Sequence, residues 1–483
     1  MVNAKAVNII RGLNRKELLK FEKFIDSPYF NSNTKLKKLY KILKNFYPDF
    51  ESPQCNKENI YKYVYDKENF SDEKLRKLFS DLYKLAEKYL VVLNLERNRM
   101  DYSKLLLEEL DSRKIDNVYL SKYNEAAEYL NKIGYHYQIF LRSHELKWQN
   151  VSFHLSRGEQ FKLPPEIFER SEQLIFYFLS DLFITLNDID MNKLNFNYAH
   201  PQNLPQKFVD NLNMESIYKY IRENDFRNKE IFSLYYFAFL MNKHFDNEHY
   251  FFQLKKSLDA NIDKLNKPGK MNFVLLMINY CNLKMKKSNN LEFEKEKLIL
   301  YDKLIKYELY DSNYFRTDVF LNIFMTYLRH GKVAEANTFI EDNIRSINPA
   351  HSKSLISLCK ASILFETGKY QESLAIAAKI RSNMLFIKIY LRKLLMKIDY
   401  ELHEFDTTKD SANNYRQFIV GTKIIGETNK NILLEFIRNY NDLIKLKIDN
   451  TDGFMMRELK KKIDTISDGL DREWFTKKIE SIG

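Results

Sequence analysis

Three short segments of this chain repeat one pattern and constrain its fold more than any other feature. The segments are "YLRHGKVAEA" (327–336), "LFETGKYQES" (364–373) and "DYELHEFDTT" (399–408). In each segment a helix ends, a short turn follows and a second helix begins. The turn positions 331, 368 and 403 are 37 and 35 residues apart. Helix–turn–helix repeats of this length stack against their neighbours, and the resulting arrays mostly bind other macromolecules.

The composition favours helices along the whole chain. Of 483 residues, 45% are hydrophobic and 29% are charged, which is enough to bury a large core, and only 11 glycines and 9 prolines interrupt the sequence. Segments of Leu, Lys, Glu and Ile therefore run long without a break, as is typical of helical proteins. We predict an all-α fold.

The spacing of apolar residues and helix breakers predicts three regions. Residues 1–100 form a basic N-terminal helical module, residues 101–225 a region of long helices, and residues 226–483 an array of helical hairpins. The clearest single helix covers residues 71–93, where Ser71 is a suitable N-cap. The segment 117–155 is expected to break near Gly134, and the polar, Asn-rich residues 188–205 are expected to form a loop.

The segment 315–412 resembles the tetratricopeptide repeats, whose units are helical pairs of about 34 residues. In the first unit, the residues at the family's large, aromatic, turn and small positions are Phe320, Tyr327, Gly331 and Ala336. In the second unit the matching residues are Ala361, Leu364, Gly368, Tyr370 and Ser373. In the third unit the glycine, tyrosine and alanine are replaced by His403, Phe405 and Thr408. The resemblance covers about a fifth of the chain and implies an α-solenoid without naming its ligand.

The resemblance also implies that the first helix of each pair lines a concave groove for a protein or peptide. In that register the groove residues are Leu321, Met325 and Arg329 in the first unit, Leu358, Ser362 and Phe365 in the second, and Arg392 and Met396 in the third, with Lys388 and Lys393 nearby. The apolar members of this set are also placed to pack against neighbouring helices, and packing is the interpretation we favour for them.

The positive charge of the chain is concentrated near its N-terminus. The net charge is +12, and residues 1–100 hold 21 Lys and Arg against 13 Asp and Glu, a net of +8. Such asymmetry points to nucleic acid or another acidic partner, although a solvated lysine-rich surface has the same composition. Four lysines form a stripe along the helix predicted at 71–93: Lys74, Lys77, Lys84 and Lys88.

The helices around this stripe loosely resemble the winged-helix module that precedes repeat domains in some bacterial transcriptional activators. The resemblance implies a nucleic-acid-binding function for residues 1–100. Arginine is the usual reader of bases, and the candidate reading helix holds only Arg76. The four lysines would therefore contact phosphates without reading the sequence.

No catalytic or metal-binding pattern accompanies the repeats. The sequence has no HExxH pair, no glycine-rich phosphate loop, no GxSxG elbow and no CxxC pair. We therefore expect no enzymatic activity, no cofactor and no metal. The most apolar stretch, 231–240, is far shorter than the roughly 20 residues of a membrane span. With no signal segment at the N-terminus and three scattered cysteines, we expect a cytoplasmic protein.

These observations predict a non-catalytic scaffold or adaptor that binds a protein or peptide in a helical-repeat groove. The alternative is a nucleic-acid-binding regulator that joins a basic N-terminal module to a repeat-type sensor. The identity of the partner, the pathway and the oligomeric state stay open.

Overall fold

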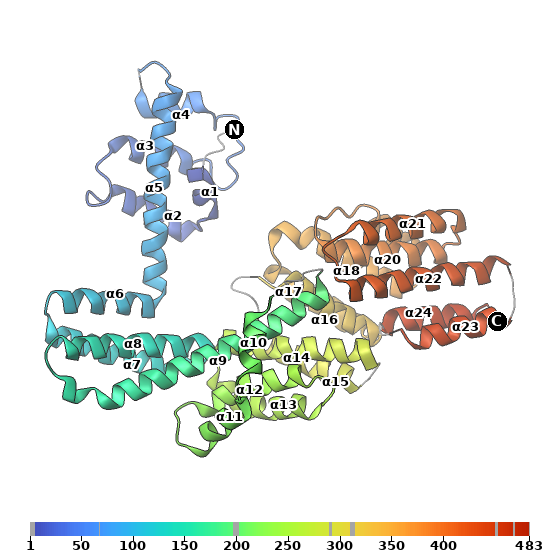
Figure 1. Ribbon diagram of the computed structural model, residues 1–483. Helices are drawn as coiled ribbons and strands as arrows, with labels where there is room; N and C mark the ends of the chain where they lie inside the picture. The colour runs from blue at the N-terminus through green and yellow to red at the C-terminus, as the bar shows by residue number, and fades with distance from the viewer. Residues whose placement is uncertain are drawn as a thin grey trace. The chain divides into compact units, whose positions relative to one another are not determined.

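The chain is helical throughout the part that the structure describes. The computed structural model describes residues 5–66, 68–196, 202–288, 292–309, 314–449, 453–466 and 469–482. Within these ranges the chain forms the α-helices α1–α24 and three short 3-10 helices, and it forms no β-strand (Figure 1). The all-α fold predicted from the sequence is therefore confirmed.

The helices divide into two compact units. Unit 1 comprises residues 1–130 and 145–164, and unit 2 comprises residues 131–144 and 165–483. The helices of unit 1 are α1 (Lys5–Gly12), α2 (Arg15–Asp26), α3 (Thr34–Lys44), α4 (Lys57–Tyr65), α5 (Asp72–Arg97), α6 (Arg99–Ser112), most of α7 (Asp116–Lys132), the last part of α8 (Tyr137–Leu155) and the 3-10 helix η1 (Gln160–Lys162). The predicted divisions of the chain at residues 101 and 226 stay predictions.

The long helix α5 organises the first part of unit 1. The Ser71 hydroxyl accepts a hydrogen bond from the Lys74 backbone N–H at 3.3 Å, so Ser71 is the N-cap that the sequence predicted. An apolar stripe along α5 is buried among α1–α4: Leu75, Leu78, Leu82, Leu85 and Tyr89. The Tyr89 hydroxyl donates to the Glu17 carbonyl at 2.8 Å, and the Phe21 ring stacks on the Tyr89 ring with centroids 4.9 Å apart. These contacts fix α2 against α5.

Unit 2 contains the end of α7 and the first part of α8, followed by one long helix and a series of shorter ones. Its helices are α9 (Pro164–Asn195), α10 (Leu204–Asp210), α11 (Met214–Glu223), α12 (Lys229–Lys243), α13 (His249–Asn261), η2 (Ile262–Lys264), α14 (Lys267–Ser288), α15 (Glu292–Lys306), α16 (Thr317–Arg329), α17 (Val333–Asn343), η3 (Ile344–Ser346), α18 (Pro349–Glu366), α19 (Tyr370–Ala377), α20 (Leu385–Glu401), α21 (Phe405–Gly421), α22 (Glu427–Asp449), α23 (Gly453–Asp464) and α24 (Gly469–Glu480). The loop predicted at 188–205 was wrong at both ends, because α9 continues to Asn195 and α10 begins at Leu204; residues 197–201 lie outside the described residues.

The three sequence repeats form helical hairpins with the same turn. The residues at the predicted turn positions, Gly331, Gly368 and His403, have φ of 67°, 77° and 62°. In each turn the next residue donates its backbone N–H to a carbonyl five residues earlier, at 2.9, 2.8 and 3.0 Å. This is the Schellman arrangement, which satisfies carbonyls at the end of the first helix. The conformation needs a left-handed residue, and glycine adopts it without steric cost.

Small residues let the two helices of a hairpin approach closely. Ala336 of α17, together with Ala361 of α18 and Ser373 of α19, is fully buried. The Ser373 hydroxyl donates to the Ala361 carbonyl at 2.7 Å, which joins α19 directly to the backbone of α18. The matching side chains of the third hairpin, Phe405 and Thr408, lie outside the described residues.

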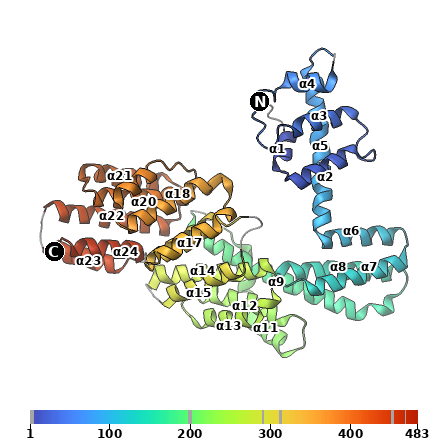
Figure 2. The ribbon, with the colours of Figure 1, turned by 180° about the vertical axis from the view of Figure 1, so that it is seen from behind.

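Successive hairpins lie next to one another along unit 2. The pairs α12–α13, α14–α15, α16–α17, α18–α19 and α20–α21 each pack together, and the first helices of neighbouring pairs also meet, α12 with α14, α16 with α18 and α18 with α20. The pairs lie side by side in both views (Figures 1 and 2). A single apolar core extends through them from Phe140 to Ile479. The helices α22–α24 follow, and α24 returns to contact α16.

Candidate binding surface

Most apolar residues predicted to line a groove lie inside the repeats. The exposed fraction of Leu321, Met325, Ser362 and Phe365 is 8% or less, and Leu358 and Met396 are fully buried. The Ser362 hydroxyl donates to the Leu358 carbonyl within α18 at 2.9 Å, and the Phe365 ring packs 5.4 Å from the Tyr370 ring of α19. These side chains pack between helices, which is the interpretation that we favoured from the sequence. They offer no surface to a partner.

The charged residues of the predicted groove lie closer to the surface. Lys388 and Arg392 are half-buried on α20. The Arg392 guanidinium lies over the Phe418 ring of α21, 4.0 Å from its centroid, and burial lowers the pKa of this arginine. This contact joins α20 to α21, the two helices of one hairpin. Arg329 and Lys393 lie at the contact of α16 and α20 with the C-terminal helix α24.

Helix α24 lies against the first helices of the repeats. Its Asp471 carboxylate, which is 4% exposed, pairs with Lys393 and with Lys397 of α20, the latter at 2.8 Å. The Glu401 carboxylate at the end of α20 accepts hydrogen bonds from Trp474 Nε1 at 2.7 Å and from Lys478 Nζ at 2.6 Å. Charges of both signs on α20 are thus matched by opposite or polar groups on α24.

Aromatic rings complete the contact of α24 with α20 and α22. The Trp474 ring meets the Tyr400 ring edge-on, with centroids 5.3 Å apart, and stacks on the Tyr440 ring at 6.1 Å. The Phe475 ring lies 5.4 Å from the Phe436 ring. The Tyr440 hydroxyl donates to the Met396 carbonyl at 2.5 Å. Burial and the nearby Asp399 carboxylate raise the pKa of Tyr440, so its hydroxyl keeps the proton that it donates.

A charged cleft of about 650 Å³ opens beside α24. We call it the α24 cleft, and it is lined by Glu294, Arg329, His330, Asp464, Arg472, Glu473, Thr476, Lys477 and Glu480. On one side, Glu294 of α15 lies 3.2 Å from Arg329 Nη1 and 3.8 Å from His330 Nε2. On the other side, Lys477 Nζ lies 2.6 Å from Glu473, and the hydrogen bond to Glu473 raises the pKa of Lys477.

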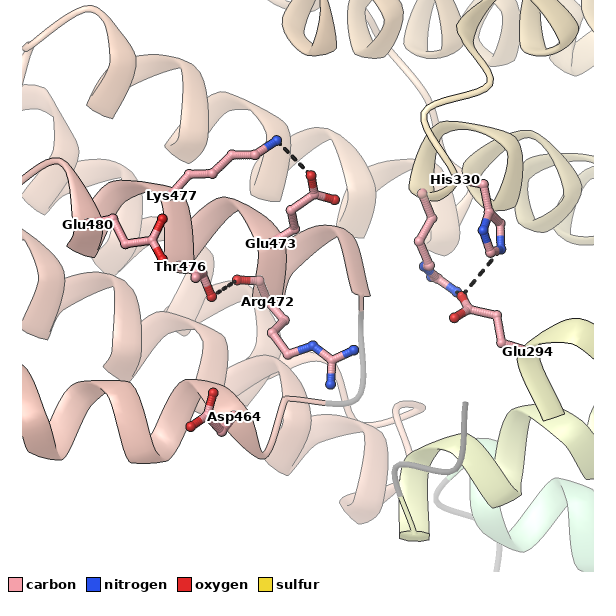
Figure 3. Close-up of a pocket in the computed structure, with 9 residues that line it drawn as sticks. Glu294, His330, Asp464, Arg472, Glu473, Thr476, Lys477 and Glu480 are labelled. Carbon is pink, nitrogen blue, oxygen red and sulfur yellow. Dashed lines mark hydrogen bonds and ion pairs between the residues drawn. The ribbon is translucent and has the colours of Figure 1, made fainter. Parts of the chain in front are cut away.

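The walls of the α24 cleft present charges of both signs. Figure 3 shows Glu294 and His330 on one wall and Arg472 on α24 extending toward them from the other. Only Arg329 among its residues was predicted from the sequence. The other members are His330 at the end of α16 and residues of α15, α23 and α24. They lie up to more than a hundred residues apart in the sequence, so no local pattern brings them together. Mixed charge at short spacing suits a peptide or protein surface better than an apolar small molecule.

The predicted basic stripe lies on the surface of α5 in unit 1. Lys74, Lys77, Lys84 and Lys88 are all exposed. Lys74 Nζ lies 2.7 Å from Glu68, which raises the pKa of Lys74 and neutralises its charge locally. Within the described ranges, no carboxylate forms an ion pair with the other three lysines.

Comparisons with known proteins add no family to these observations. No family model, no curated protein and no solved structure matches this chain. In the described ranges no helix has the length and apolarity that crossing a membrane requires. Nor does that part of the chain bring together three His, Cys, Asp or Glu side chains suited to a metal ion.

Proposed function

We propose that residues 226–483 form a tetratricopeptide-like α-solenoid and that the protein is a non-catalytic scaffold or adaptor. It binds a protein or peptide on the face made by the first helices of its hairpins. The observation that carries this proposal is the α24 cleft, a charged hollow that borders this face and is large enough for several side chains of a partner.

Two further observations support the proposal. The hairpins of 315–412 share one turn geometry, and the first two place the small residues Ala336, Ala361 and Ser373 where helices meet, as stacked repeats require. The face that would bind a partner already accommodates a helix, because α24 lies on it with its aromatic residues buried. A surface that binds one helix of this chain has the shape and chemistry to bind another.

The proposal is tested by cross-linking from the receptor side of the cleft. His330 is exposed at the end of α16 and lines the cleft, so a photoreactive amino acid placed there contacts whatever binds. Lys379 is exposed just after the end of α19 and does not line the cleft, which makes it the matched control site. We expect a defined partner cross-linked in cells from position 330 and absent from position 379. Equal products from the two sites, or none from position 330, would refute the proposal.

The alternative is a nucleic-acid-binding regulator that uses α5. The observation in its favour is that Lys77, Lys84 and Lys88 are exposed on one side of α5. Charge reversal of these three lysines should then weaken binding of the full chain to a random DNA duplex and flatten its salt dependence, as measured by fluorescence anisotropy. Reversal of the exposed Lys332, Lys360 and Lys379 of unit 2 is the matched control. Equal binding of the two triple variants would count against a role for α5.

A further inference from the structure

Helix α24 meets α20 through polar contacts that run in both directions. An acidic residue of α24, Asp471, pairs with two lysines of α20, and an acidic residue of α20, Glu401, binds Trp474 and Lys478 of α24. Buried ion pairs contribute little net stability compared with apolar packing, and their best-attested role is to fix register and partner choice. This contact therefore has the character of a specific recognition surface.

The residues of α24 that make these contacts share one helical face. Asp471, Trp474 and Lys478 are at positions i, i+3 and i+7, the spacing with which an amphipathic helix binds a groove. The Phe475 and Ile479 side chains continue the same face and are almost fully buried. The neighbouring Glu473 is not part of this set, because it lines the α24 cleft instead.

Helix α24 also departs from the order of the hairpins. The pairs from α12 to α21 contact their neighbours in the chain, and α24 likewise packs on α23, but α24 also reaches back to α16 and lies against α20 and α22. It has 12 residues, a length at which an isolated helix is marginal in water. Its helical state therefore depends on the surface that it covers, as that of a bound peptide does.

The surface beneath α24 favours an acidic occupant. Lys397 is 6% exposed, and its ammonium lies 2.8 Å from Asp471 and 5.4 Å from the centre of the Trp474 ring. Lys393 also pairs with Asp471, and its ammonium lies 5.0 Å from the centre of the Phe436 ring. A replacement for α24 that lacks a carboxylate loses both of these ion pairs at a largely buried place, so the contact favours an occupant that supplies one.

We propose that the surface of α16, α20 and α22 beneath α24 is the partner-binding surface of the repeats. It takes an amphipathic helix of another protein that presents an acidic residue, an aromatic pair and a basic residue at the spacing of Asp471, Trp474–Phe475 and Lys478. Helix α24 is the resident occupant and keeps the surface covered until such a helix replaces it. This inference rests on the proposed function, because it assigns a chemistry to the partner of that scaffold.

The competition between α24 and a partner helix can be measured with the full chain. The probe is a fluorescein-labelled peptide of residues 469–482, and the readout is its anisotropy. Tethering gives α24 a high effective concentration, so the wild-type chain should bind the peptide weakly. The double variant Asp471→Ala, Trp474→Ala weakens α24 and leaves the receptor helices unchanged, and we expect it to bind the peptide at least ten-fold more tightly.

Two matched controls separate release of α24 from a general effect of substitution. Glu458→Ala with Lys461→Ala removes an exposed ion pair of the neighbouring helix α23, outside the α24 cleft, and this variant should bind the peptide as weakly as the wild-type chain. We call the double variant Asp471→Ala, Trp474→Ala the released variant. Adding Glu401→Lys to it should abolish the gain in peptide affinity, because Glu401 binds both Trp474 and Lys478. A released variant that keeps its circular dichroism and shows no gain overturns the inference, as does a gain that survives Glu401→Lys.

A second measurement does not depend on a variant that folds. Hydrogen exchange of the wild-type chain is followed at millimolar unlabelled peptide, where we expect faster exchange in α24 and unchanged exchange in α20. Unchanged hydrogen exchange in α24 overturns the inference. Self-association of the released variant also overturns it, because the occupant would then be a second copy of this chain. Cross-linking from position 330 tests the proposed scaffold function separately. A partner cross-linked from position 330, together with no gain in peptide binding by the double variant, would refute only this inference.

Discussion

Gly331 and His403 adopt the same left-handed backbone conformation at the ends of α16 and α20, with φ of 67° and 62°. The following residue closes the same hydrogen bond in both turns, Lys332 to the Tyr327 carbonyl at 2.9 Å and Glu404 to the Asp399 carbonyl at 3.0 Å. The turn geometry is therefore kept where the glycine is replaced. A side chain at this position is tolerated at the expense of backbone strain.

The strain at the turn position can be measured at Gly368, which has φ of 77° and open space around its missing side chain. Gly368→Ala should lower the free energy of unfolding by about 1–2 kcal/mol, because only the backbone conformation opposes the new methyl group. Gly368→Asn should cost less, since asparagine tolerates this conformation. Urea denaturation followed by Trp474 fluorescence in a Trp148→Phe background reports on unit 2. The control is Gly421→Ala, a helical glycine with equally open space, which should be neutral or stabilising.

A different glycine is required by close approach of two backbones. A Cβ on Gly134 would lie 2.6 Å from the Asn266 nitrogen and 2.8 Å from the Leu265 carbonyl carbon. The two segments are held together by hydrogen bonds from Tyr135 N–H to the Lys264 carbonyl at 2.8 Å and from Asn266 N–H to the Tyr135 carbonyl at 3.1 Å. Gly134→Ala should therefore destabilise unit 2 by about 1–3 kcal/mol in the same assay. A loss no larger than that of Gly421→Ala would contradict this account.

The sequence predicted features that depend on neighbouring residues. Ser71 caps α5, the segment 117–155 breaks around Gly134, and the turns at 331, 368 and 403 have one geometry. Each depends on backbone preferences within a few residues, which the sequence displays directly. The loop predicted from residue 188 is wrong, because that prediction relied on local polarity. Polarity does not reveal that α9 continues to Asn195.

The candidate surface depended on contacts that no local pattern contains. The resemblance to tetratricopeptide repeats implied that Leu321 and Met325 line a groove, and both side chains pack inside the repeats. The contact of Asp471 with Lys393 joins residues 78 positions apart. The sequence offers one signal for it, the adjacent aromatic residues Trp474 and Phe475. The direction in which α24 turns back is set by tertiary packing alone.

Arg157 holds three segments of unit 1 together, and its removal should destabilise that unit. Its guanidinium lies 2.7 Å from Asp111 and 3.0 Å from Asp116, and it covers the Phe153 ring at 3.5 Å with only 14% of the side chain exposed. Arg157→Ala leaves two carboxylates without their partner and should cost about 2–3 kcal/mol. Trp148 fluorescence in a Trp474→Phe background reports on unit 1. The control Arg113→Ala breaks an exposed pair with Glu109 and should cost less than about 0.5 kcal/mol.

Glu17 should make the stability of unit 1 depend on pH in the acid range. Its carboxylate accepts the Asn14 backbone N–H at 2.8 Å and pairs with Arg97, and the pKa of Glu17 is lowered first by that backbone hydrogen bond and then by Arg97. A carboxyl group stabilises the fold when its pKa is lower in the folded state than in the unfolded state. This contribution is complete above the unfolded pKa, which is about 4.3 for glutamate, and it is lost as the pH falls through the folded pKa. Glu17→Gln should therefore lower the free energy of unfolding by about 1 kcal/mol at pH 7 and by progressively less below pH 4. Urea titrations of the two chains at several pH values measure the difference. A difference that stays constant from pH 7 to pH 3 would show that the charge of Glu17 does not contribute.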